Sequence, residues 1–346
     1  MKKTVRIAAA LLCLMMVLSL CGCSDSMTQK QVFAMDTIMT LTAYGKHAED
    51  GIASAEGIIS SMDSMLNPKS ESSYAYLINN AQGQSVIVPP QVARMLTTAK
   101  TVYDRSNGAL DLSVYPIYLA WGEFKEESGR VPSDNELKTL RAMENFGSMT
   151  VTDFSGESNY SVSIAEGTQI SFGAVAKGCA SEYAVDAMRK AGVESGIVSL
   201  GGNVQTLGLK PDGTKWTVAV ENPRAAGSYL GTLSVGETAV VTSGNYQRYF
   251  TRDGQTYHHI INPSTARPTD NGLLSVTVVC DDGTMADCLS TAMYVLGEKS
   301  AMKYWREYGD FDMIMVTEDG RVVCTSGLIE VFTLTDTSKY TVSFVE

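Results

Sequence analysis

The chain has 346 residues and a formal net charge of −11 at pH 7. An acidic chain of this kind is poorly suited to nucleic acid or to an anionic lipid surface, because both would repel it. An anionic ligand would therefore have to be held by a local group of cations and not by the overall field. A body of this length can form one large domain or two packed lobes.

The first 22 residues have the pattern of an export signal. A basic start precedes an apolar run over 7–20, which is short for a membrane span. The next residues, Leu20-Cys21-Gly22-Cys23, match a bacterial lipobox, so we expect Cys23 to carry the lipid. The alternative is a plain signal peptide with incidental cysteines. The lipobox predicts an exported protein anchored to the extracytoplasmic face of the cell membrane, with three parts: a lipoprotein signal peptide over 1–22, a lipidated N-terminus and short tether over 23–30, and the folded body over 31–346.

Four cysteines remain in the body, and they show no CxxC or metal-like spacing. Two disulfides and scattered buried thiols are both compatible with an exported chain. These cysteines are Cys179, Cys280, Cys288 and Cys324.

The body mixes helical and strand-like patterns without strict β-α-β alternation. Apolar stripes at helical spacing run over 52–66 and 92–103, and Ser133 with Glu136 reads as a capping box. The run 32–44 alternates like a strand, and from residue 149 onward strand-like runs such as 168–172 dominate. Pro211-Asp212-Gly213 is a hairpin turn signal among them. A helix closed by Gly297 and a second over 300–308 follow. This pattern favours an α+β fold with mixed, largely antiparallel sheets and packed helices.

One short stretch, 170–178, joins a strand-like run to a helix-like pattern through small residues. Its lysine, Lys177, lies at the predicted helix start. Small residues allow close approach of a ligand, and a helix N-terminus with an added charge suits a phosphate group. Taken alone, a tight strand-to-helix connection with an exposed lysine explains the stretch equally well.

Asp287 and Thr291 are four residues apart in a predicted helix, so both side chains lie on one face. A carboxylate and a hydroxyl are hard oxygen ligands of the kind that Mg²⁺ prefers. The alternative is an acid favoured by the helix dipole beside an ordinary threonine. Of the adjacent histidines His258 and His259, only one can face a given site if they lie on a strand. That one could bind a ligand or transfer a proton.

Read together and in order, these segments resemble one family, the flavin transferases of the ApbE type. The resemblance covers nearly the whole mature chain. Met35-Asp36-Thr37 resembles an M-G-T motif, and Phe172 to Gly178 resembles L-G-A-I-A-K-G. The other matching segments are Asp63 to Glu71, Gly108-Ala109-Leu110-Asp111 (G-A-F-D), Leu200-Gly201-Gly202-Asn203 (L-G-G-N), Thr242 to Tyr246 (T-S-G-D-Y), His259 to Pro263 (H-I-I-D-P) and Ala286-Asp287 to Thr291 (A-D-x-x-x-T).

The resemblance implies a single, T-fold-like catalytic domain that moves the FMN part of FAD to a threonine hydroxyl of a partner flavoprotein and releases AMP. The partner would be a subunit of a membrane redox complex or a protein with an FMN-binding domain. Mg²⁺ would be held by Asp287, Thr291 and the carbonyl of Ala174. The implied contacts to FAD are Met35, Ala109, Leu110, Asp111, Ser171, Lys177 and His259.

Chemistry of this kind needs stabilised charge on the phosphate oxygens, which a metal ion and Lys177 can provide. It also needs a base near the attacking hydroxyl, and His259 and Asp111 are both candidates. The chain departs from the family pattern where Ser171, Asn245 and Asn262 replace acids. Cys179 replaces a tyrosine and Ala266 a glycine. These departures leave open a non-catalytic FAD-binding lipoprotein, and a solute-binding lipoprotein of a transporter is a third alternative.

Overall fold

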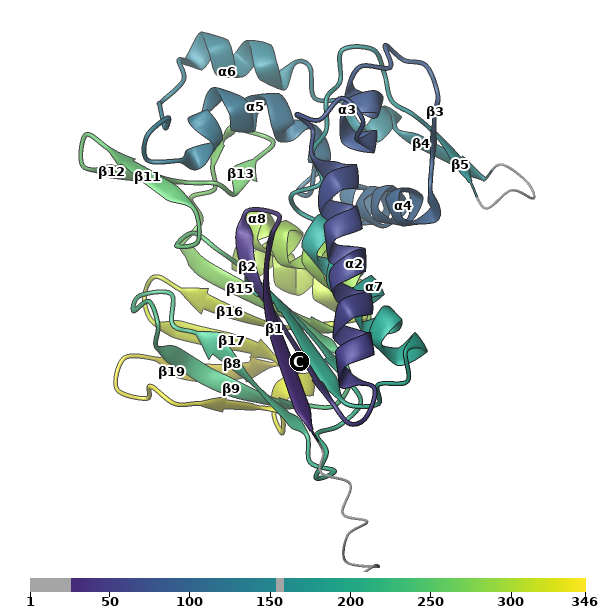
Figure 1. Cartoon of the computed structure of the whole chain (residues 1–346). Helices are drawn as coiled ribbons and strands as arrows, with labels where there is room; N and C mark the ends of the chain where they lie inside the picture. Colours follow the sequence, from purple (N-terminus) through teal and green to yellow (C-terminus); the bar gives the residue numbers. More distant parts are fainter. Residues whose placement is uncertain (1–25, 154–158) are drawn as a thin grey trace, which may run out of the picture.

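A nine-stranded sheet forms the centre of the molecule in the computed structural model, which describes residues 26–153 and 159–346 (Figure 1). All neighbouring strands are antiparallel except β17 and β19, which are parallel. In spatial order the strands are β1 (Met27–Ala34), β2 (Thr37–Tyr44), β6 (Gly196–Leu200), β7 (Asn203–Leu207), β10 (Ala239–Gly244), β15 (Leu273–Cys280), β16 (Asp312–Thr317), β17 (Arg321–Thr325) and β19 (Thr341–Val345).

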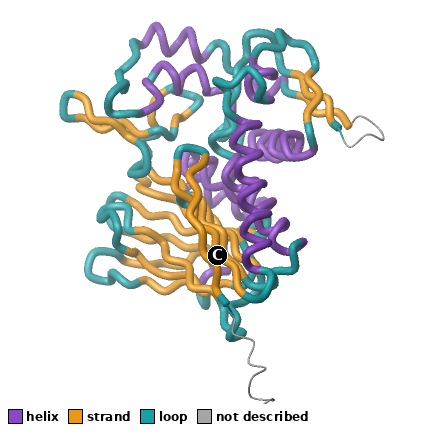
Figure 2. The backbone as a smooth tube through the Cα atoms, viewed as in Figure 1, coloured by secondary structure: helices purple, strands orange, loops and turns teal. Residues whose placement is uncertain are grey.

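Long helices cover one face of this sheet, and a small second sheet covers part of the other (Figure 2). Alternation along the strands explains the two layers: on β10, Val241 faces the helices, whereas Val240 faces the small sheet. The helices on the sheet are α2 (Ala48–Leu66), α7 (Ala176–Lys190) and α8 (Gly283–Tyr308), and α4 (Pro90–Arg105) packs against α8. The small sheet has the order β18 (Phe332–Leu334), β9 (Tyr229–Val235) and β8 (Trp216–Glu221). The predicted α+β class is confirmed.

The remaining elements lie above the central sheet in Figure 1. They include α3 (Tyr74–Asn79), α5 (Tyr115–Ala120) and α6 (Asp134–Arg141). The strands there are β3 (Val86–Val88), β4 (Thr150–Asp153), β5 (Tyr160–Ser163), β11 (Tyr249–Arg252), β12 (Gln255–His258), β13 (Ile261–Asn262) and β14 (Arg267–Pro268). Short 3-10 turns are η1 (Leu112–Val114), η2 (Gly122–Phe124), η3 (Phe146–Ser148) and, beside β17, η4 (Ser326–Leu328).

A third apolar cluster, centred on Trp121, joins the segments around α5 and β11. The Trp121 ring stacks on Phe124 with centroids 5.7 Å apart, and its Nε1–H donates to Ala266 O at 3.0 Å. Phe250 of β11 packs against both rings. This cluster, called here the Trp121 cluster, comprises Ile117, Trp121, Phe124, Leu137, Phe250, Ile261 and Ala266.

Several predicted helix boundaries are confirmed. The side chain of Ser133 accepts the backbone N–H of Glu136 at the start of α6, as the capping box predicts. Gly297 has φ +74° and interrupts α8, so a helix does end there before the next begins. Both boundaries were readable because each depends on one residue with a strong local preference.

Three local predictions were wrong. The run over 32–44 is two strands, because the backbone turns at Met35 and Asp36. The segment 168–172 pairs with no strand of the described chain, and its polar groups bond to Asn79 and Leu112 instead. The predicted hairpin turn at 211–213 joins β7 to β8, which lie in different sheets.

The N-terminal predictions lie mostly outside the described residues, among them the signal peptide over 1–22 and Cys23. The tether predicted over 23–30 is shorter than expected, because β1 begins at Met27 and pairs with β2. Within 26–153 and 159–346, no helix is long and apolar enough to span a bilayer. The four cysteines of the body are free thiols, and three of them are buried.

Candidate functional site

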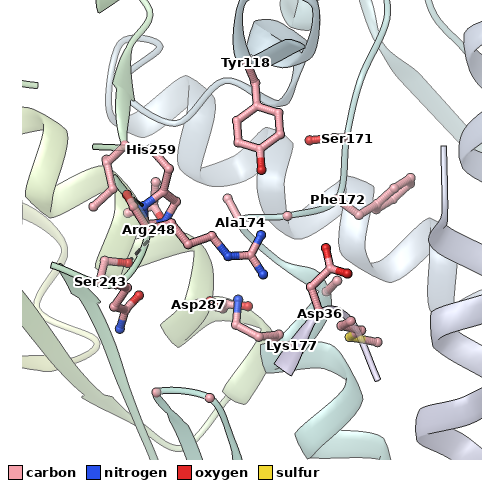
Figure 3. A pocket seen from close by; sticks show the side chains of 18 of the residues that line it. Asp36, Tyr118, Ser171, Phe172, Ala174, Lys177, Ser243, Arg248, His259 and Asp287 are labelled. Atoms are coloured by element: carbon pink, nitrogen blue, oxygen red, sulfur yellow. Dashed lines mark hydrogen bonds between the residues drawn. The ribbon is translucent and has the colours of Figure 1, made fainter. Parts of the chain in front are cut away.

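A cavity of about 850 Å³ lies where the tip of the β1–β2 hairpin, the loop before α7, the segment after β10 and the first half of α8 meet. The ten residues that the resemblance implies for FAD and Mg²⁺ all line this cavity: Met35, Ala109, Leu110, Asp111, Ser171, Ala174, Lys177, His259, Asp287 and Thr291. They come from segments as far as 256 positions apart in the chain. Figure 3 shows five of them around one space: Ser171, Ala174, Lys177, His259 and Asp287. The size is that of a cofactor-binding cleft.

The floor of the cavity depends on a close crossing of α7 and α8. A Cβ on Gly178 would lie 2.1 Å from the Gly283 oxygen and 2.6 Å from the Asp287 Cβ, so only glycine fits there. The crossing lets the Gly178 N–H, at the start of α7, donate to Asp287 Oδ2 at 2.8 Å. This hydrogen bond fixes the Asp287 carboxylate at the N-terminus of α7.

Asp287 is 4% exposed and forms no ion pair with any residue that the structure describes. A buried carboxylate without a cation is costly, which is a reason to expect a positive ligand. Thr291 lies one turn further along α8, and the Ser243 hydroxyl lies 3.3 Å from the Thr291 hydroxyl. With the backbone of Ala174 in the same wall, all the donors are oxygens, as Mg²⁺ prefers. The residues present therefore fit a magnesium ion.

Two cations point into the cavity, Lys177 from the first turn of α7 and Arg248 from the segment between β10 and β11 (Figure 3). Neither side chain has a carboxylate within ion-pair distance in the described part of the chain. Lys69 and Lys125, also in the wall, both pair with Glu123. The cavity therefore holds two uncompensated positive charges beside the oxygen cluster, an arrangement suited to a pyrophosphate.

Sequence reasoning missed Arg248, and it discussed Asp36 only as a departure from the M-G-T motif. Arg248 lies two residues beyond the T-S-G-N-Y stretch, and no spacing or periodicity distinguishes it from other loop arginines. Asp36 occupies the two-residue turn of the hairpin, with φ +58°, and lines the cavity. Only the folded chain brings these two charged residues, 212 positions apart, into the wall of one cavity.

Of the adjacent histidines His258 and His259, only His259 lines the cavity. This agrees with the expectation that neighbouring residues of an extended segment point to opposite sides. Its Nδ1 lies 3.2 Å from Arg248 O. A carbonyl only accepts, so Nδ1 carries the proton in this contact and Nε2 is left as an acceptor. Burial, and then the positive charge of Arg248, lowers the pKa of His259 to about 3. His258 is buried and bonds to Thr269 O at 2.8 Å, which is a structural role.

Asp111 lies in the wall but already has a structural partner. Its Oδ1 accepts both the backbone N–H and the hydroxyl of Ser113, at 2.7 and 2.6 Å, and so caps η1. Burial raises the pKa of Asp111. Glu144 lies nearby, and burial followed by the charge of Asp111 raises the Glu144 pKa to about 8. One carboxylate oxygen of Asp111 is therefore occupied by structural hydrogen bonds.

The remaining predicted contacts differ in what they present. Leu110 is buried in the main core, so it contributes packing to the wall rather than a polar group. The backbone N–H of Ser171 donates to Leu112 O at 3.1 Å, which holds the loop before α7 against η1. The Ser171 side chain faces the same space as Tyr118 (Figure 3).

A large cavity with two cations, a cluster of oxygen groups and a histidine has the features that suit a phosphorylated, nucleotide-sized ligand. The model of the ApbE family matches residues 35–315. The chain belongs to the ApbE family.

Relatives support the same assignment. A FAD:protein FMN transferase of Klebsiella pneumoniae is 31% identical over 252 residues, covering 72% of this chain and 76% of that protein. One of Vibrio cholerae is 29% identical over 323 residues, covering 90% and 94%. The solved ApbE protein of Thermotoga maritima has a TM-score of 0.78 and 26% identity, covering 91% of this chain and 98% of that one. The flavinyl transferase ApbE of Pseudomonas stutzeri has a TM-score of 0.74 at 26% identity, covering 90% and 94%.

Proposed function

We propose that this protein is an FAD:protein FMN transferase. It moves the FMN part of FAD to a threonine hydroxyl of a partner flavoprotein, forms a phosphoester bond and releases AMP, with Mg²⁺ as the metal. The observation that carries the proposal is the pairing of two uncompensated cations, Lys177 and Arg248, with the buried oxygen cluster of Asp287 and Thr291 in one cavity. A pyrophosphate needs both positive charge and a metal site.

In this reaction the threonine oxygen attacks the phosphorus on the FMN side of the pyrophosphate. The P–O bond to the AMP phosphate breaks, and AMP leaves with the electron pair. Lys177 and Arg248 bind the non-bridging oxygens and stabilise the charge that develops on them. Mg²⁺, when bound, would supply Lewis-acid stabilisation of a phosphate group. Asp287, fixed by the Gly178 N–H, and Thr291 would hold that ion.

The acceptor hydroxyl must lose its proton as it attacks. His259 suits this role better than Asp111, since Nε2 of the neutral imidazole is free to accept. Asp111 has one oxygen engaged by Ser113 and lies in a wall where burial disfavours its charge. We therefore assign the base to His259 and a structural role at the flavin-contacting wall to Asp111.

Export and anchoring belong to the same proposal. The lipobox at 20–23 supports lipidation of Cys23 and a location on the outer face of the cell membrane. Cys23→Ser should move the protein from the membrane fraction to the soluble fraction and abolish labelling by palmitate. Cys21→Ser is the matched control and should change neither. Retention of the Cys23→Ser protein in membranes would contradict the anchor.

The activity is tested by incubating the full-length chain in detergent with FAD, Mg²⁺ and an FMN-binding acceptor domain that carries the target threonine. A fluorescent flavin band that survives denaturing electrophoresis, with an equal amount of AMP, is expected. An acceptor with valine in place of that threonine should stay unlabelled. Binding of flavin without its transfer to the acceptor would contradict the proposed activity.

The metal assignment is tested by Asp287→Asn, which keeps the side-chain shape but removes the charge. Transfer should fall by about a hundredfold or more, because the removed charge is argued to act on the reacting phosphate. Asp281→Asn is the control, since Asp281 is exposed just before α8 and does not line the cavity. Undiminished transfer by Asp287→Asn, with normal folding by circular dichroism, would remove this residue from the metal site.

A further inference from the structure

Two large apolar side chains lie exposed on the β1–β2 hairpin. Phe33 is 73% exposed and Ile38 is 63% exposed. They are direct cross-strand partners, so their side chains lie side by side on the same face of the hairpin. We call them the Phe33–Ile38 pair.

This pair differs from the middle of its face. The next partners along the hairpin on that face are polar: Gln31 lies opposite Thr40, and Gln29 donates to the Thr42 hydroxyl at 3.0 Å. The solvent-facing side of an antiparallel sheet is normally polar. Two polar rungs separate the pair from Met27, the exposed apolar residue at the far end of the same face. The pair at the last rung before the turn is therefore a local apolar patch.

The hairpin brings the pair to the rim of the cavity. The turn residues Met35 and Asp36, which follow Phe33 closely, both line the cavity. The backbone N–H of Met35 donates to Asp63 Oδ1 at 3.0 Å, which ties the tip to the end of α2. Figure 1 shows the hairpin of β1 and β2 extending from the central sheet toward the upper segments, which include α3 and α5. The pair thus flanks the three residues of the hairpin tip that line the cavity, Met35, Asp36 and Thr37.

The small sheet contacts the hairpin at its base. The contact there is between the Tyr44 and Trp216 rings, with centroids 6.2 Å apart. Tyr44 is the last residue of β2, at the end far from the turn. The Phe33–Ile38 pair lies at the opposite end and keeps its exposure.

We propose that the Phe33–Ile38 pair is part of the surface on which the acceptor protein docks, an inference that rests on the proposed function. The second substrate is a folded protein whose hydroxyl must reach the cavity, so its neighbouring surface must meet the rim. A membrane or a second copy of this chain has no such need to meet the rim. A rigid apolar pair at the rim is the kind of anchor that protein interfaces use.

The test compares the double variant Phe33→Thr/Ile38→Thr with the unchanged full-length chain. Threonine keeps strand propensity, so folding is preserved. The KM for the FMN-binding acceptor domain, and its dissociation constant measured by biolayer interferometry, should each rise about tenfold or more. FAD affinity, measured by quenching of flavin fluorescence, should stay within twofold. Met27→Thr is the matched control, because Met27 is 58% exposed on the same face at the far end of the hairpin.

Unchanged acceptor affinity in the double variant would overturn the inference. So would a parallel loss of FAD affinity, since the pair would then act on the nucleotide. A change confined to self-association in sedimentation, or to binding of vesicles of anionic phospholipid, would also overturn it by assigning the pair to another copy or to lipid. If the unchanged chain transfers no flavin, the proposed function fails, whereas the direct acceptor-binding measurement still decides the docking surface.

Discussion

The protonation of His259 is decided by its neighbours. Burial and the charge of Arg248 lower the pKa of His259 to about 3, and Lys177 acts in the same direction. The imidazole is therefore neutral at pH 7, which is the form that a base requires. A pyrophosphate bound between Lys177 and Arg248 would offset the charges that depress the pKa, so the base becomes stronger when the substrate is present.

Removing the charge at Arg248 should therefore raise the pKa of His259. In Arg248→Met the imidazole should titrate at a clearly higher pH, still below its ordinary value because burial remains the larger cause. Ring-nitrogen NMR measures this directly, since the chain contains three histidines. Arg252→Met, four residues away and bonded to Gly129 O, is the control. An unchanged His259 titration in Arg248→Met would show that Arg248 exerts no such field.

At the scale of elements, the crossing of α7 over α8 fixes the geometry of the site. Gly178 and Gly283 meet there without side chains, and this brings the Asp287 carboxylate within 2.8 Å of the Gly178 N–H. The same contact joins the two segments that the sequence analysis treated as separate hypotheses, a phosphate-binding helix start and a metal pair. Each feature alone has an ordinary structural explanation, whereas the crossing places the start of α7 and the Asp287–Thr291 pair in one site.

Gly178→Ala should separate the two helices. The new Cβ would collide with the Gly283 carbonyl at 2.1 Å, and backbone cannot move aside cheaply. We expect a loss of about 2 kcal/mol in the free energy of unfolding, and a larger loss of transfer because Asp287 moves. Urea denaturation and the transfer assay measure the two effects.

Gly173→Ala is the matched control for stability, because its Cβ would meet nothing closer than Ser171 Oγ at 3.9 Å. It should unfold at the same urea concentration as the unchanged chain. Equal stability of Gly178→Ala and Gly173→Ala would mean that the helices tolerate the extra carbon and that the close crossing is dispensable.

Elements that end at a strong local signal were predictable from the sequence, and those defined by distant contacts were not. The capping box at Ser133 and the break at Gly297 are local. The turn between β1 and β2 could not be predicted from the sequence, because its two residues, Met35 and Asp36, have a positive φ and neither is a glycine. The segment 168–172 looks like a strand, but its polar groups are taken by Asn79, 91 positions away from Ile170.

For the whole molecule, the order of the sheet could not be read from the sequence, because β10 lies between β7 and β15 and β19 returns beside β17. That order brings residues from α2, α7 and α8 and from the Trp121 cluster to one cavity. The site residues themselves were found because the family motifs mark them individually. Arg248 was missed because the motifs do not include it.

The cavity wall draws on two apolar clusters, with Phe172 from the main core and Ile261 from the Trp121 cluster. A ligand that spans the cavity should therefore stabilise both parts together. With Mg²⁺ and FAD at about a hundred times its dissociation constant, we expect about 2.7 kcal/mol of added stability. Differential scanning calorimetry should show this as a rise in Tm, and hydrogen exchange should slow in both α5 and β10.

Asp287→Asn provides the control, because it should lose the part of the stabilisation that depends on Mg²⁺ while keeping the part that FAD supplies alone. Protection confined to β10 would mean that the ligand contacts only the main core. The Trp121 cluster would then be a separate unit that makes no contact with the nucleotide. Slower exchange on both sides is what a ligand bound across the cavity requires, since the open form of either cluster would have to release it.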